Sequence, residues 1–178
     1  MARRSYYDID DILSGQERVP CVLRVDLDGL GSAGSGTSKV HRNVRWALPY
    51  WMADRMNEED YVDMEAPPVF SKRATRMYAA SPVSMQLRAI CQYYYKFGLQ
   101  LGDMVPEIPH VLRNMYMERV QMIARVSQQG QNVEGLDFVH SLDKTESQML
   151  ALCQQAGGAI SSWHQGKAYA LRKASVIG

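Results

Sequence analysis

The sequence predicts a mainly α-helical protein that carries a small β-rich module at its N-terminus. Up to residue 66, many apolar residues alternate with polar ones, which is the period of a half-buried strand. Beyond residue 68, apolar residues recur every three or four positions, which is the period of a helix buried along one side. The double proline Pro67-Pro68 marks the change. We therefore predict a β-rich module over residues 1–66 and a helical bundle over residues 67–178.

The first element that we expect is a short amphipathic helix over residues 8–13. Ile9, Ile12 and Leu13 share one side at helical spacing, and Asp10 and Asp11 lie elsewhere on the helix. An acidic start also favours the positive end of a helix dipole. We expect the isoleucine side to be buried and both aspartates to face water.

Three strands and one helix follow in the predicted β-rich module. Alternation predicts strands over residues 21–28, 44–48 and 62–64. Leu48 is followed by Pro49, which a first helical turn tolerates, and this predicts a helix over residues 49–56. We expect Trp51 on this helix to cover the strands and to anchor the module. The stretch 29–39, rich in Gly and Ser, reads as a loop.

Four helices are predicted in the C-terminal part. Their starts are marked by Ser or Pro and their ends by Gly or Pro. The third begins at Pro106 or Pro109 and ends before Gly130, and the fourth is closed by Gly157-Gly158. The other two span residues 70–80 and 82–101, and Gly102 is expected to cap the latter in the left-handed conformation.

Composition excludes several classes of protein. The 178 residues carry a net charge of +1, so the chain lacks the basic excess of a general nucleic-acid binder. Three cysteines without a Cys-x-x-Cys spacing indicate a reducing compartment. The chain has no run of apolar residues long enough to span a bilayer and no signal-like start. We expect a soluble intracellular protein.

No motif predicts catalysis, a cofactor or a metal. Residues 29–34 match G-x-G-x-x-G, but no helix follows and no acidic residue stands about 20 positions further on, as a dinucleotide site requires. The four histidines have no second ligand at metal spacing. We expect no catalytic residue, no cofactor and no metal.

The aromatic and methionine clusters predict a binding surface. Successive helical residues point about 100° apart, so Tyr93, Tyr94 and Tyr95 cannot all face one core. Tyr94 shares the apolar stripe of its helix, which makes Tyr93 or Tyr95 the candidate contact with a protein partner. Pliable methionines suit such a surface as well, and the candidates are Met115, Met117 and Met122.

A second interpretation is direct binding of single-stranded nucleic acid. Tyrosine rings can stack on bases, and interleaved cations can bind phosphate. Arg113, Arg119 and Arg125 are expected on a similar side of the third helix. This alternative remains open from the sequence.

An ordered set of short motifs resembles one known family. The set consists of the Asp10-Asp11-Ile12-Leu13 segment, the Leu48-Pro49-x-Trp51 pattern, the Phe97-Gly98 pair and Trp163 with its neighbours. Taken in this order they resemble the Psf-three subunits of the eukaryotic GINS complex.

The resemblance implies a fold and a function. The implied fold is a β-rich B domain followed by a helical-bundle A domain. The implied function is that of a non-catalytic scaffold subunit in a nuclear GINS heterotetramer. Its implied partners are the three other GINS subunits, and Cdc-forty-five and the Mcm ring in the assembled replicative helicase. DNA polymerase epsilon is implied as a partner through the complex.

Overall fold

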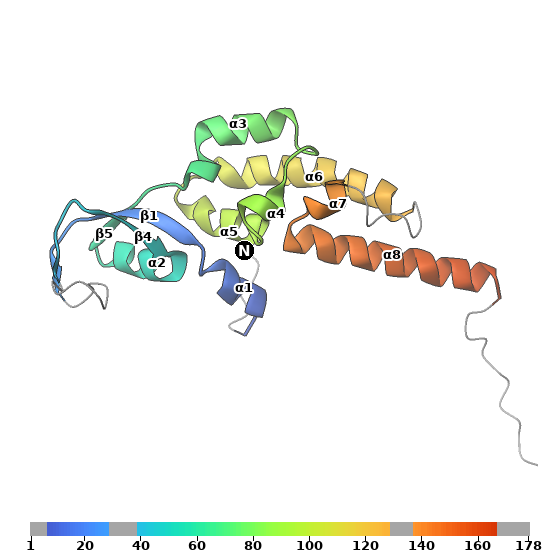
Figure 1. The fold of residues 1–178 in the computed structure, drawn as a ribbon, viewed down its shortest axis with the longest axis horizontal. Helices are drawn as coiled ribbons and strands as arrows, with labels where there is room; N and C mark the ends of the chain where they lie inside the picture. The colour runs from blue at the N-terminus through green and yellow to red at the C-terminus, as the bar shows by residue number, and fades with distance from the viewer. Residues whose placement is uncertain (1–6, 29–38, 129–136, 167–178) are drawn as a thin grey trace, which may run out of the picture.

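The computed structural model describes residues 7–28, 39–128 and 137–166, and this part of the chain is mainly helical with a small antiparallel sheet. The predicted fold class is therefore confirmed. The sheet and α2 lie at one end of an elongated molecule, and α8 extends from the other (Figure 1). The elements are α1 (Ile9–Ser14), β1 (Arg18–Leu23), β2 (Leu27–Asp28), β3 (Lys39–Val40), β4 (Arg45–Pro49), α2 (Tyr50–Glu58), β5 (Val62–Met64), η1 (Pro68–Phe70), α3 (Lys72–Ala80), α4 (Leu87–Ile90), α5 (Tyr94–Gln100), η2 (Leu101–Asp103), α6 (Ile108–Ser127), α7 (Asp137–His140) and α8 (Lys144–His164).

The three-stranded sheet has the order β4-β1-β5, and both pairings are antiparallel. Val19, Cys21 and Leu23 are buried on one face of β1, where α2 packs. The opposite face carries charged residues, and Arg45 contacts Glu65 across it at 3.4 Å. The strand predicted over 21–28 is shifted, because β1 already begins at Arg18 and ends at Leu23. Of the loop predicted over 29–39, residues 29–38 lie outside the described residues, and Lys39 begins β3.

Tyr50, and not Trp51, anchors α2. Tyr50 is buried, its hydroxyl donates to the carbonyl oxygen of Gln100 at 3.0 Å, and its ring lies 6.2 Å from that of Phe97. Trp51 is 57% exposed. The helix begins at Tyr50, so Tyr50 and Ala53 share the inner side and Trp51 points about 100° away. The prediction that Trp51 covers the strands is wrong.

The helix α1 forms as predicted, but its faces are reversed. Ile9 and Ile12 are exposed, whereas Asp8 and Asp11 contact Lys96 of α5 at 3.1 Å and 3.0 Å. The side chain of Gln100 on α5 also donates to the Ser14 hydroxyl at 3.0 Å. Because α5 presents polar side chains here, the polar side of α1 faces the protein.

The helix predicted over 82–101 is split into α4 and α5. Cys91 between them is extended, with φ −159° and ψ 130°. The backbone N–H of Tyr94 bonds to the Asp143 carboxylate, and the Gln92 carbonyl accepts from the Lys144 N–H. These bonds to the start of α8 replace helical ones. Gly102 lies in the 3-10 turn η2 and does not form the predicted left-handed cap.

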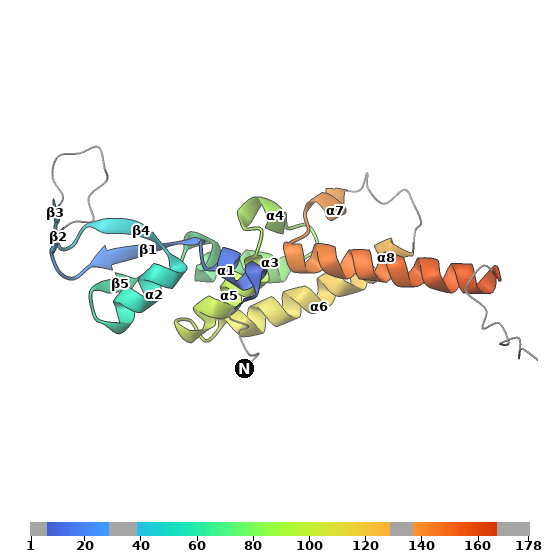
Figure 2. The ribbon, with the colours of Figure 1, turned by 90° about the horizontal axis from the view of Figure 1, so that it is seen from below.

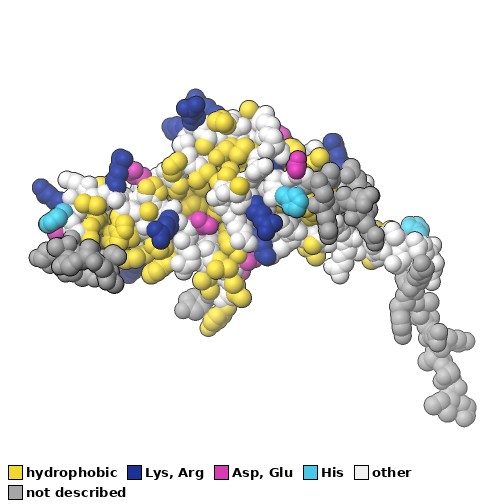
Figure 3. Space-filling model, viewed as in Figure 1, with side chains coloured by type: hydrophobic (Ala, Val, Ile, Leu, Met, Phe, Trp, Pro, Cys, Tyr) yellow, Lys and Arg dark blue, Asp and Glu magenta, His cyan; other side chains and the backbone are white. Residues whose placement is uncertain are grey.

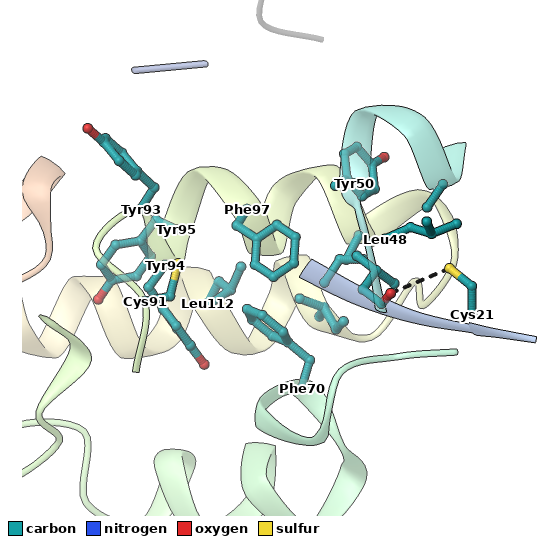
Figure 4. Close-up of a cluster of buried hydrophobic side chains, with 14 of the residues drawn as sticks. Cys21, Leu48, Tyr50, Phe70, Cys91, Tyr93, Tyr94, Tyr95, Phe97 and Leu112 are labelled. Carbon is teal, nitrogen blue, oxygen red and sulfur yellow. Dashed lines mark hydrogen bonds between the residues drawn. The ribbon is translucent and has the colours of Figure 1, made fainter. Parts of the chain in front are cut away.

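One hydrophobic cluster runs from the sheet into the helices (Figure 4). Phe70 stacks on Tyr94 with ring centroids 4.9 Å apart, and Phe97 meets Phe70 edge-on at 5.7 Å. Gly98 lies where helices meet, since a Cβ there would be 2.6 Å from Cδ1 of Leu112. Leu48 is buried in the same cluster. The core therefore joins residues on both sides of Pro67-Pro68.

Candidate protein-interaction surface

A buried ionic network fixes the first turn of α8 to the bundle. Arg119 of α6 donates from Nε to Glu146 Oε1 at 2.7 Å and from Nη2 to Oε2 at 2.9 Å, and both side chains are fully buried. The Tyr95 hydroxyl donates to Oε1 of Glu146 at 2.7 Å. Arg119 Nη1 also donates to the backbone carbonyls of Pro82 and Met85. α8 is therefore tied to α5, to α6 and to the segment before α4.

Asp143 caps α8 from inside the protein. Its Oδ1 accepts the backbone N–H of Lys144 at 2.6 Å and that of Tyr94 at 3.2 Å. Glu146 reaches back to the Asp143 N–H, which completes a capping box. Burial raises the pKa of Asp143 to about 6, although the N–H donors of Lys144 and Thr145 oppose the shift.

The far part of α8 is exposed. From Ala151 to His164 every residue except Cys153 is exposed, and α8 extends past the end of α6 (Figure 1). Apolar side chains nevertheless recur on one side of this stretch, and Trp163 is 68% exposed. We call these residues the α8 strip: Leu152, Ala156, Ile160 and Trp163.

Gly157 and Gly158 lie within this exposed stretch, and α8 continues through them. The prediction that they end the helix is wrong. An added Cβ at either position would have no atom within 4 Å. Their lack of side chains therefore leaves room for another helix to approach the backbone closely.

Three of the predicted interface residues are buried inside the chain. Tyr93 and Tyr95 are 8% and 7% exposed, and Met115 is 1% exposed. The physical reason is that α5 is short and surrounded: Tyr95 reaches α8 through Glu146, and Tyr94 faces Phe70. Tyr93 is the residue just before α5, and its ring points away from Phe70 in Figure 4. The prediction that Tyr93, Tyr95 and Met115 contact a partner is wrong.

The other two predicted contacts on α6 differ. Met117 is 56% exposed, so a partner can reach it. Met122 is half-buried and packs against the cluster of Ile123, Val126 and Leu150.

The arginines of the alternative interpretation do not form one surface. Residues six positions apart in a helix are rotated by about 240°, so Arg113, Arg119 and Arg125 point in three directions. Arg119 is fully buried against Glu146. With the tyrosines buried as well, the predicted nucleic-acid surface is wrong in its named residues.

Sequence reasoning missed the α8 strip. Leu152, Ala156 and Ile160 stand four residues apart, which is a readable helical signal. It was hidden because the helix was expected to end at Gly157-Gly158. Trp163 carries part of the family resemblance, and that motif alone does not indicate that its side chain is exposed.

The described part of the chain lacks both a metal site and a membrane-spanning helix. No group of three or more His, Cys, Asp or Glu side chains in that part of the chain could hold a metal ion. No described helix is long and apolar enough to cross a membrane. Burial raises the pKa of Cys91 to about 12 and that of Cys21 to about 11, so neither thiol is a ready nucleophile near neutral pH.

Comparison with known proteins points to one family. The family model described as "PSF3 N-terminal domain" matches residues 7–57, from α1 through most of α2. The "DNA replication complex GINS protein psf3" of Schizosaccharomyces pombe is 29% identical over 162 residues, which cover 89% of this chain and 96% of that protein. The protein of the same name in Aspergillus fumigatus is 27% identical over 170 residues, covering 89% of this chain and 96% of that protein. The Xenopus laevis protein is 24% identical over 181 residues, covering 97% of this chain and 86% of its own length.

Proposed function

Because this chain is related over nearly its whole length to the Psf3 proteins of the DNA replication complex GINS, we propose that it is a non-catalytic scaffold subunit of a GINS heterotetramer in the nucleus. As part of that assembly it would join Cdc-forty-five and the Mcm ring in the replicative helicase. Contact with DNA polymerase epsilon would be made through the complex. The kinship supports the role in DNA replication, and the surface of α8 supports assembly with other subunits.

The observation that supports assembly with other subunits is the exposed C-terminal part of α8. Isolated helices shorter than about 12–15 residues are marginal in water, and each interior glycine costs about 1 kcal/mol relative to alanine. The 14 residues from Ala151 to His164 include two glycines and are exposed almost throughout. Such a segment gains stability when another protein covers its apolar side. The α8 strip offers the spacing by which one helix packs into a bundle with another.

The test is co-expression with the three other GINS subunits. We expect the chain to elute with all three as one species in size-exclusion chromatography. Leu152→Ser combined with Ile160→Ser removes apolar side chains from the α8 strip, so it should weaken assembly by about tenfold or more. Both residues are exposed, so the free energy of unfolding of the variant chain alone should stay within about 0.5 kcal/mol of that of the parent.

Met77→Ser is the matched control. Met77 is 61% exposed and lies on α3, which is on the other side of the bundle from α1 in Figure 1. This variant should assemble like the parent. If the parent does not elute with the other three subunits, the proposed function is wrong. If the α8 variant assembles as tightly as the control, the α8 strip is not the surface through which the chain assembles with the other subunits.

A further inference from the structure

A second exposed apolar surface lies on α1, at the opposite side of the bundle from α3. It consists of large side chains on α1, on the residue before its N-cap and at the start of α2, and the projecting hydrophobic side chains of α1 are visible in Figure 3. Ile9 is 70% exposed. We call these residues the α1 patch: Tyr7, Ile9, Ile12, Leu13 and Trp51.

Trp51 belongs with α1 because the two backbones are joined. The Trp51 N–H donates to the Gly15 carbonyl at 3.2 Å, and a Cβ at Gly15 would lie 3.8 Å from that of Trp51. Trp51 thus stands beside the C-terminal end of α1. Exposed tryptophan is among the residues that contribute most to binding when a partner covers them.

The α1 patch is apolar because the acidic residues of α1 are engaged within the chain. Lys96 binds both Asp8 and Asp11, and its hydrogen bond lowers the pKa of Asp8. Asp10 accepts a hydrogen bond from Gln148 of α8 at 3.3 Å. Carboxylates at the rim also disfavour nucleic-acid phosphate and anionic lipid headgroups. The chemistry therefore favours an apolar protein surface as the occupant.

Alone, the α1 patch is too small to hold a partner. It comprises one six-residue helix and a single tryptophan, whereas a stable interface uses about 20–30 residues on each side. A partner that binds here must therefore also contact a neighbouring surface.

The α8 strip is the neighbouring surface that the contacts identify. Gln148, which binds Asp10, stands one turn before Leu152 on α8. Residues four positions apart in a helix are rotated by only about 40° relative to one another. Leu152 therefore follows Gln148 on nearly the same side, and α1 and α8 are both in view when the molecule is seen from below (Figure 2).

We propose that a single partner subunit spans the α1 patch and the α8 strip as one continuous interface. This inference rests on the proposed function, because the partner is one of the other subunits of the complex. The reversed faces of α1 then serve to present an apolar surface to the partner. Its polar side is bound by Lys96 and Gln148, so its apolar side is held out for the partner.

The test places a photo-crosslinking residue at single positions in the assembled four-subunit complex. p-Benzoylphenylalanine in place of Ile12 and, separately, in place of Leu152 should crosslink to the same subunit. The same residue in place of Met77 is the control and should not crosslink to that subunit. Mass spectrometry of the products identifies the subunit.

A binding measurement complements the crosslinks. Ile9→Ser combined with Leu13→Ser should weaken assembly by about tenfold or more, whereas Met77→Ser should leave it unchanged. Crosslinks from Ile12 and Leu152 to two different subunits would overturn the single-partner interface, as would the absence of any crosslink from Ile12. An α1 variant that assembles like the parent would also overturn it and leave the proposed function standing. Failure of the parent complex to form would overturn both the single-partner interface and the proposed function.

Discussion

Arg119 is a buried cation whose partners come from three parts of the chain. A buried ion pair contributes little net stability, but removal of one partner costs about 3–5 kcal/mol because the other charge is left unpaired. Arg119→Met leaves Glu146 and the carbonyls of Pro82 and Met85 without their donor. We expect a loss of this size in the free energy of unfolding, measured by urea denaturation.

Two further variants separate the charge effect from simple loss of a side chain. Arg113→Met, on the exposed side of the same helix, should change stability by less than about 0.5 kcal/mol. Arg119→Met combined with Glu146→Met should be less destabilising than Arg119→Met alone, since no buried charge remains unpaired. A double variant that costs as much as the two single changes together would contradict this account.

Asp143 should make the stability of the chain depend on pH. Burial penalises the charge and raises the pKa of Asp143 in the folded protein to about 6, from its ordinary value of 3.8. The folded state therefore holds this proton more tightly than the unfolded state. The resulting stabilisation is fully present below pH 3.8 and is lost as pH rises through 6, and it amounts to about 3 kcal/mol at most.

Comparison with Asp143→Asn isolates this titration, because Arg119 and Glu146 are present in both chains. From pH 5 to pH 7.5, the free energy of unfolding of the parent should fall by about 1.4 kcal/mol relative to that of the variant. Asparagine keeps an acceptor for the Lys144 N–H, so α8 stays capped. Parallel pH profiles for the two chains would show that Asp143 does not titrate in this range.

At the scale of the elements, the same substitution should have opposite effects in two helices. Gly98→Ala in α5 places a Cβ 2.6 Å from Leu112 and 2.9 Å from Phe70, so we expect it to cost about 1–3 kcal/mol. Gly157→Ala in α8 meets no atom within 4 Å and removes an interior glycine, so it should gain about 0.5–1 kcal/mol. Urea denaturation of the two variants beside the parent measures both. A stabilising Gly98→Ala would mean that α5 and α6 can separate freely.

The elements that were predicted correctly are those with local signals. Pro49 marks the start of α2, alternation marks β4, and a sustained helical period marks α6. The break between α4 and α5 has no such signal, because it depends on bonds from Asp143, 49 positions beyond Tyr94. The pair Gly157-Gly158 predicted the end of α8, but the helix continues through both glycines to His164.

The candidate surfaces were harder to predict than the elements for the same reason. Three adjacent tyrosines would leave an exposed ring if α5 stood alone. In the folded chain, Tyr95 is enclosed by Glu146 from α8, 51 positions away. The reversed faces of α1 depend on Lys96, 88 positions beyond Asp8. Helical spacing tells which residues share a side, but only the fold tells which side is covered.

At the scale of the whole molecule, the shared core predicts one unfolding transition. Tyr50 in α2 contacts Phe97 and Gln100 in α5, and the same cluster extends from Val19 to Met115. In a Trp163→Phe background, the remaining tryptophans are Trp46 and Trp51, both on the N-terminal side of Pro67. Their fluorescence and the helical circular dichroism should change at the same urea concentration, because neither part keeps its core without the other.

Two separated transitions would show that the modules unfold independently and that the Tyr50 contacts are weak. Tyr50→Ala provides a direct check on the coupling. It should lower the midpoint seen by both probes together, by an amount that corresponds to about 3–5 kcal/mol for loss of a buried aromatic.

Because α8 is held to the bundle at its N-terminal end, a small tilt there moves its far end by a larger distance. Its base is held by Arg119 and Asp143, and the 14 residues beyond Leu150 form an arm about 20 Å long at 1.5 Å per residue. A tilt of about 10° at the base moves the tip near Trp163 on the order of 3–4 Å. Slight repacking around one ion pair is thus magnified into a displacement as large as a side chain. A protein bound along the far part of α8 can therefore shift by the same distance while the core of the bundle stays unchanged.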